Sequence, residues 1–166
     1  MTAARQQRKS RSALVALLGL AVGSGILAPG ALPAAPADRT VVNPQSGLAV
    51  SGFDPVAYFG EGKPELGRPD VELTLGGVVW RFRNEGNRAA FSEHPDVYMP
   101  RFGGYDPVAI ARGASVPGHP LFWAVTDGRL YLFYNAPASD AFVAEPSRII
   151  DAAERKWPDV ARAIGR

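Results

Sequence analysis

The chain has 166 residues, 46% of them hydrophobic and 20% charged, and three Trp, five Tyr and eight Phe can supply a core for one compact domain or two very small ones. It has no Cys, which excludes disulfides, thiolate metal sites and cysteine nucleophiles. The formal net charge of +2 arises from residues 1–37, which hold four of the 18 basic and none of the 16 acidic residues. The remaining 14 bases and 16 acids give a net charge of −2, which argues against a nucleic-acid-binding protein.

Residues 1–37 form the pattern of a secretory signal peptide. Basic residues within 5–11 precede an apolar stretch at 13–22, and Ala35 and Ala37 are small residues at the positions that a signal peptidase reads. The apolar stretch is short and broken by glycine, whereas a membrane-spanning helix needs about 20 residues. We therefore expect cleavage near Ala37 and a periplasmic or secreted mature protein. The alternative is an uncleaved N-terminal anchor, which would then be the only contact with a membrane.

Residues 38–51 show no helical period and are expected to form an extended lead-in. Beyond them the sequence repeats itself. Gly52–Ala57 matches Gly104–Ala109 at an offset of 52, and further matches follow at an offset of 51, so that one single-residue insertion or deletion separates the two registers. The later pairs are Gly62 and Gly113, Gly67 and Gly118, Pro69 and Pro120, Gly77 and Gly128, Phe82 and Phe133, Asn84 and Asn135, Phe91 and Phe142, and Pro95 and Pro146. We interpret residues 52–103 and 104–166 as two diverged copies of one module.

Each copy is expected to begin with a short helix. Asp54 and Asp106 each precede a proline and a short apolar run, and Asp at the N-cap followed by Pro at the first helical position is a preferred helix start. Gly60 and Gly113 are suitable helix ends. We therefore interpret Asp54 and Asp106 as structural caps. The alternative is that the two carboxylates form a paired acidic site.

A β-hairpin is expected next in each copy. Gly76-Gly77 and Asp127-Gly128 are strong signals for a two-residue turn. The strands expected on either side of these turns are 71–75 and 78–83 in the first copy, and 121–126 and 129–134 in the second. Because side chains alternate along a strand, Trp80 and Phe82 are expected to face the core. In the second return strand the pattern allows either of two pairs, Leu130 with Leu132 or Tyr131 with Phe133.

Helices are expected after each hairpin, around 86–93 and 138–145, with Phe91 and Phe142 as core anchors. Prolines at the end of each helix, Pro95 and Pro146, are expected to limit them. The chain closes with apolar residues three and four positions apart, which predicts a C-terminal amphipathic helix. These residues are Ile149, Ala153, Trp157, Val160 and Ile164. Pro158 is expected to break this helix into two pieces. The pattern as a whole predicts an α+β fold, in which two tandem helix–β-hairpin–helix units pack around one core as one small domain.

Several of these motifs resemble the YHS domain. The residues concerned are Asp54-Pro55-Val56, Trp80-Arg81-Phe82, and Asn87–Phe91 followed by Pro95 and Tyr98. Three longer stretches are similar to the exported YHS-domain proteins of bacteria. They are Ser51–Phe59 with Gly62-Lys63-Pro64, Pro100–Tyr105 and Asp127–Leu132, and the resemblance covers roughly residues 48–158.

The resemblance implies a YHS-like fold and an association with metal handling, for which many members of the family carry cysteines suited to soft metals. In this sequence the corresponding positions hold Ala57, Arg83, Asn87 and Asp106. The resemblance therefore favours the fold more strongly than it favours metal binding.

A metal site without thiols would have to use the histidines, which are His94 and His119. Met99 and neighbouring carboxylates are candidate further ligands, and an imidazole with a thioether would suit copper. The carboxylates concerned are Glu93, Asp96 and Asp106. Both histidines precede a proline in a predicted turn, a setting more typical of surface residues. Metal-ion binding or handling through His94, His119 and these carboxylates, with Met99 as a further candidate ligand, is the second hypothesis.

The sequence contains no pattern typical of an enzyme. None of its serines stands in a Gly-x-Ser-x-Gly setting, and no glycine-rich phosphate loop joins a strand to a helix. We therefore expect neither catalysis nor a resident cofactor, with a metal ion as the one alternative. An unrecognised enzyme remains the third hypothesis.

A binding function is the preferred interpretation because the short chain is rich in aromatic residues. The candidates are Tyr58, Phe59, Trp80, Tyr98, Phe102, Tyr105, Trp123, Tyr131 and Tyr134. Most are expected in the core, but a buried tyrosine hydroxyl also needs a polar partner. Tyr58, Tyr105, Tyr131 and Tyr134 are therefore the candidate ligand-binding residues. We expect an exported YHS-domain-like, non-enzymatic protein that binds a small ligand or a protein partner.

Overall fold

The computed structural model describes residues 40–165. The predicted signal peptide lies outside this range. Among residues 40–165, no helix has both the length and the apolar character that crossing a membrane requires.

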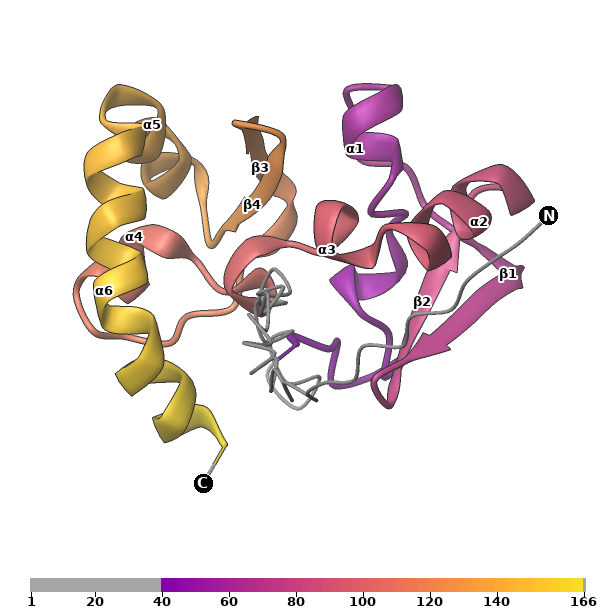
Figure 1. The fold of residues 1–166 in the computed structure, drawn as a ribbon, viewed down its shortest axis with the longest axis horizontal. Helices are drawn as coiled ribbons and strands as arrows, with labels where there is room; N and C mark the ends of the chain where they lie inside the picture. Colours follow the sequence, from indigo (N-terminus) through magenta and orange to yellow (C-terminus); the bar gives the residue numbers. More distant parts are fainter. Residues whose placement is uncertain (1–39, 166) are drawn as a thin grey trace, which may run out of the picture. The chain divides into compact units, whose positions relative to one another are not determined.

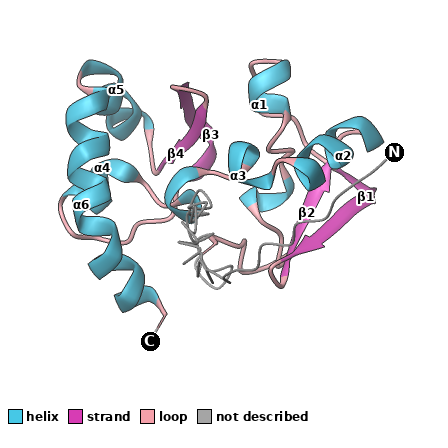
Figure 2. Cartoon of the chain, viewed as in Figure 1, coloured by secondary structure: helices cyan, strands magenta, loops and turns pink. Residues whose placement is uncertain are grey.

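The described chain combines short helices with two antiparallel hairpins, which confirms the predicted α+β class (Figures 1 and 2). The elements of the first half are η2 (Val50–Gly52), α1 (Ala57–Gly60), β1 (Arg68–Leu75), β2 (Val78–Phe82), α2 (Glu85–Glu93) and α3 (Pro95–Tyr98). Those of the second half are η3 (Arg101–Gly104), α4 (Pro107–Ala111), β3 (His119–Thr126), β4 (Arg129–Phe133), α5 (Ala136–Ala144) and α6 (Pro146–Ile164). The two halves thus have the same order of elements.

Both hairpins turn at the predicted dipeptides. Gly76 and Gly77, and likewise Asp127 and Gly128, have positive φ at both central positions, which is the backbone of a type I′ turn. β1 and β3 begin earlier than expected, and each ladder shifts register after its first residue pair.

A glycine stands just before each hairpin, where the backbone passes very close to neighbouring segments of the chain. A Cβ on Gly67 would lie 2.5 Å from the Arg81 carbonyl carbon, and one on Gly118 would lie 2.7 Å from the Gly104 oxygen. Each of the two glycines also donates a backbone hydrogen bond of 2.9 Å to the glycine before the Asp-Pro motif, Gly52 or Gly104. These contacts hold the start of each hairpin against the turn that precedes the Asp-Pro motif.

Strand β4 is buried on both faces. Leu130 and Leu132 pack in one cluster with Trp80, Phe82 and other residues of the first half. The alternate residues of β4, which are Tyr131 and Phe133, pack in a second cluster with Phe142, Ile149 and Val160. The sequence left these two pairs as alternatives, and the structure uses both. The expectation of one core is wrong, because the buried residues form two clusters and β4 contributes one face to each.

The predicted phenylalanine anchors are confirmed. The ring centroid of Phe91 on α2 lies 4.8 Å from that of Trp80 and 5.1 Å from that of Phe82. Phe142 on α5 is similarly placed in the second cluster, 5.0 Å from Tyr131 and 4.9 Å from Phe133. Each anchor therefore fixes a helix against the return strand of its own half.

The prolines after α2 and α5 begin new helices. Pro95 opens α3 and Pro146 opens α6, because proline fits the first turn of a helix, where its missing N–H needs no partner. The prediction that Pro158 breaks the C-terminal helix is wrong, since α6 runs unbroken through it. Pro158 and Glu154, whose carbonyl the proline leaves without an intrahelical donor, are both exposed, so water can satisfy that carbonyl. The predicted apolar stripe holds α6 in place through Ile149, Ala153 and Val160.

The lead-in is not extended over its described part. Asn43 caps a tight turn, where its side-chain oxygen accepts from the amides of Gln45 and Ser46, both at 3.0 Å. The turn lets Val42 bridge back to Ala49, so the segment folds on itself. A local side-chain cap of this kind competes with extended structure, which explains the departure from the expectation.

Tyr58 of α1 joins the two halves. Its hydroxyl donates a hydrogen bond of 3.0 Å to the Pro120 carbonyl, and its ring meets Trp123 edge to face with centroids 5.3 Å apart. Both partners belong to β3. The start of the second hairpin is thereby fixed to the first half.

Candidate functional site

Two charged side chains are buried among the residues that the structure describes, and they are the predicted caps Asp54 and Asp106. Each follows a turn whose backbone lies in the left-handed region, with φ of 52° at Ser51 and 55° at Phe102. Such a conformation costs about 1–2 kcal/mol per non-glycine residue. Each turn directs its aspartate between a short helix and the end of the return strand.

Asp54 accepts three hydrogen bonds. Oδ1 accepts from the Val56 amide at 2.8 Å, and Oδ2 accepts from the Arg83 amide at 2.8 Å and from Nδ2 of Asn87 at 2.7 Å. Helix α1 begins only at Ala57, so Asp54 caps the turn before the helix and does not occupy its N-cap. The carboxylate thus ties the turn to both β2 and α2.

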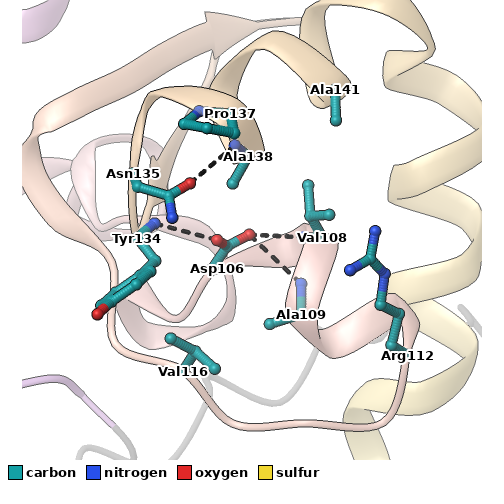
Figure 3. A pocket seen from close by; sticks show the side chains of 10 residues that line it. All are labelled: Asp106, Val108, Ala109, Arg112, Val116, Tyr134, Asn135, Pro137, Ala138 and Ala141. Carbon is teal, nitrogen blue, oxygen red and sulfur yellow. Dashed lines mark hydrogen bonds between the residues drawn. The ribbon is translucent and has the colours of Figure 1, made fainter.

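Asp106 is the N-cap of α4, as predicted, with Pro107 at the first helical position. Its Oδ1 accepts from the amides of Val108 at 2.7 Å and Ala109 at 3.4 Å, and its Oδ2 accepts from the Tyr134 amide at 3.0 Å (Figure 3). All three donors are backbone groups.

A cavity of about 290 Å³ lies beside Asp106 (Figure 3). Its polar groups come from Asp106, Arg112, Tyr134 and Asn135, and its apolar lining includes residues of α4 and α5. A second cavity of about 360 Å³, between α4, α5 and α6, shares Val108, Arg112 and Ala141 with the first. The cavity beside Asp106 is therefore a small recess with a buried carboxylate on its wall and a guanidinium at a shared edge.

Arg112 is exposed, and it has no carboxylate within 4.0 Å among the residues that the structure describes. Arg148, which lines the second cavity, differs because it is paired with Glu145. The guanidinium of Arg112 is thus available to an anionic group.

The tyrosines predicted to bind a ligand do not form one site. Tyr58 is buried at the junction of the two halves, where burial and the charge of Asp54 raise its pKa. Tyr131 is buried in the second cluster and Tyr105 packs partly buried against it, and burial raises the pKa of both. Tyr134 is 59% exposed and lines the cavity beside Asp106. One of the four predicted tyrosines therefore belongs to the candidate site.

The residues predicted to bind metal are also separate from one another. His94 is exposed after α2 with Glu93 at 3.8 Å, whereas His119 is exposed on β3, where its Nδ1 accepts from the Leu121 amide at 3.2 Å. Met99 packs against the first core cluster. Within residues 40–165, no group of three or more His, Asp or Glu side chains is arranged to hold a metal ion.

Comparison with protein-family models, with curated proteins and with solved structures finds no match for this chain.

Two residues of the candidate site, Asp106 and Tyr134, are among the functional candidates predicted from the sequence, whereas Arg112, Asn135 and Ala138 are not. A signal for the missed residues was present in the internal repeat. At the offset of 51, Ala138 corresponds to Asn87. Asn87 and Ala138 each follow the matched Asn84 or Asn135 by three positions. The change from Asn to Ala at this position indicates that the two helix starts have different surroundings.

Proposed function

We propose that this chain is an exported, YHS-domain-like, non-enzymatic binding protein, built from two tandem helix–β-hairpin–helix units, that takes up a small ligand beside Asp106. Two sets of hydrogen bonds support the duplication. The amides of Asp54 and Asp106 donate to the carbonyls of Glu65 and Val116 at 2.8 and 2.9 Å, which are matching positions of the repeat. The side-chain oxygens of Asn84 and Asn135 likewise cap α2 and α5 at 2.8 and 2.9 Å.

The observation that carries the proposed binding function is a buried carboxylate on the wall of an open cavity. Asp106 is 2% exposed, yet it lines a space of about 290 Å³. Ligand sites are typically concave, mostly apolar and equipped with a few polar groups, and they begin at roughly 300 Å³. The size of the cavity therefore fits a small molecule.

The lining favours binding over catalysis. It is composed of residues that the structure describes and includes no serine, threonine, histidine or lysine. The carboxylate of Asp106 accepts from three backbone amides, two of them in the helix that it caps and the third at Tyr134. A nucleophile paired with a base, which covalent catalysis requires, is not assembled in this lining.

A substitution that fills the cavity tests the proposed function. Ala141 is exposed on α5 and lines the cavity, so Ala141→Trp is expected to fill it. Val143→Trp is the matched control, because Val143 is exposed on the same helix but does not line the cavity. Ligand-observed NMR of the purified protein with a library of small fragments provides the readout, and circular dichroism checks that both variants are folded. We expect hits that bind the native protein and the control but not Ala141→Trp. Equal binding by Ala141→Trp, or no hits at all, would contradict the proposal.

A further inference from the structure

We propose that the ligand of this cavity is a small zwitterion, with a nitrogen hydrogen-bond donor for Asp106 and an anionic group for Arg112. This inference rests on the proposed function and names the chemical class of the ligand. It follows from a comparison of the surroundings of Asp106 with those of Asp54.

Asp106 lacks the side-chain donor that Asp54 has. Oδ2 of Asp54 accepts from Nδ2 of Asn87 at 2.7 Å in addition to the Arg83 amide, whereas within residues 40–165 Oδ2 of Asp106 accepts from the Tyr134 amide alone. A carboxylate offers about four lone-pair positions to donors. Asp106 is 2% exposed but lines the cavity, so a ligand seated there would lie beside the remaining lone-pair position of this carboxylate.

The missing donor can be located, because α2 and α5 begin in the same way. Asn84 and Asn135 are the N-caps, and each accepts from the amide three residues later, that of Asn87 or Ala138. Asn87 and Ala138 therefore hold the same position on equivalent helices. An N–H group of a ligand above Ala138 would approach Asp106 as the Asn87 carboxamide approaches Asp54.

A pair of charged residues in the first half is also changed at the matching positions of the second half, which is a second, independent difference. In the first half Arg83 forms an ion pair with Glu61, which precedes Gly62. At an offset of 51 these two residues become Tyr134 and Arg112. The ion pair is thereby replaced by a tyrosine and an arginine without a carboxylate partner among the described residues.

A ligand with complementary charges would restore what the second half lacks. Its ammonium or amide nitrogen would donate to Asp106, as the Asn87 carboxamide does for Asp54. Its anionic group would neutralise the guanidinium of Arg112, and hydrogen bonds between ionised groups are the strong ones. Because the cavity is small, one short molecule carrying both groups fits better than two separate ions.

The test uses glycine, β-alanine and 4-aminobutyrate as probes, with acetate and methylammonium as single-charge comparators. Chemical shifts of the Val108 and Tyr134 amides in the ¹⁵N-labelled protein report binding, because both amides donate to Asp106. We expect saturable shifts with at least one zwitterion, at an affinity at least tenfold above that of either comparator. Ala138→Asn, which introduces the group that serves Asp54, is expected to weaken this binding at least tenfold. Ser139→Asn on the same helix does not line the cavity and should bind like the native protein.

Arg112→Gln tests the contact with the anionic end of the ligand alone. This variant is expected to lose the preference for the zwitterion over methylammonium. Unchanged preference in that variant, or unchanged affinity in Ala138→Asn, would overturn the inference. Binding of other fragments at these amides without any response to the zwitterions would overturn it too, while leaving the proposed binding function in place. Binding of no compound would overturn both.

Discussion

At the scale of single residues, Asp54 and Asp106 show how one side-chain type acquires two roles from its neighbours. Both side chains are buried, and both accept hydrogen bonds from backbone amides. Among the described residues, Asp54 alone of the two also accepts from a side chain, that of Asn87. The difference lies in a residue 33 positions along the chain from Asp54, and the Asp-Pro motif alone does not reveal it.

Removal of the Asn87 carboxamide should therefore weaken the fold. We expect Asn87→Ala to lower the free energy of unfolding by about 1–3 kcal/mol, because a buried acceptor would lose one of its donors. Urea unfolding of the native and variant proteins measures the difference. Ala138→Asn is the reciprocal control, which should not lower stability by more than the few tenths of a kcal/mol that separate Ala from Asn in helices. An Asn87→Ala protein with the same free energy of unfolding as the native protein would contradict a stabilising role for this hydrogen bond.

At the scale of elements, the local signals in the sequence were largely correct. The Gly-Gly and Asp-Gly turns, the anchors Phe91 and Phe142, and the cap Asp106 are all where local chemistry predicts them. Signals whose effect depends on surroundings were less informative. Pro95 and Pro146 limit α2 and α5 as predicted but also begin α3 and α6, whereas Pro158, which was expected to break the C-terminal helix, lies inside α6.

The position of Pro158 leads to a prediction for α6. Proline in a helix interior is about 3 kcal/mol less favourable than alanine, but Pro158 is exposed, where water can satisfy the carbonyl it leaves free. We expect Pro158→Ala to raise the free energy of unfolding by about 1–3 kcal/mol, measured by urea unfolding. Asp159→Ala, at the next exposed position, should change stability by less than about 1 kcal/mol, since its ion pair with Arg162 is on the surface. A loss of stability in Pro158→Ala would show that the proline shapes α6 for packing.

At the scale of the whole molecule, the two core clusters meet at β4, and Tyr58 adds a second connection through Pro120 and Trp123. The sequence pattern predicted an apolar return strand but could not show that both faces are covered, because burial on two faces depends on tertiary packing. The candidate site could not be predicted from the sequence for a similar reason. Its cavity is formed by α4, α5 and the residues that follow β4, and Arg112 and Ala138 carry no motif of their own.

The connection through Tyr58 predicts a loss of stability at high pH. Burial, together with the charge of Asp54, raises the pKa of Tyr58 above its ordinary value of 10.0. Above pH 10 the unfolded chain loses this proton while the folded protein keeps it, so the free energy of unfolding falls as pH rises. The slope approaches about 1.4 kcal/mol per pH unit for one such group.

Unfolding curves between pH 8 and about pH 11 measure this slope. Tyr58→Phe is expected to be less stable near neutrality by about 1 kcal/mol, for want of the hydrogen bond to Pro120, and to lose less stability above pH 10 than the native protein. Tyr134→Phe, which changes an exposed tyrosine, should follow the native pH profile. Identical profiles for Tyr58→Phe and the native protein would show that the buried phenol does not govern this loss.

If the Asn87 carboxamide occupies beside Asp54 the space that is left as a cavity beside Asp106, an asparagine at position 138 should fill that cavity. A high-resolution crystal structure of the Ala138→Asn variant is the most direct test. We expect the introduced carboxamide to donate to Oδ2 of Asp106 at about 2.7–2.9 Å, the range of a charge-assisted hydrogen bond, and to fill the cavity. A carboxamide that points into solvent, with the cavity still open, would contradict this expectation.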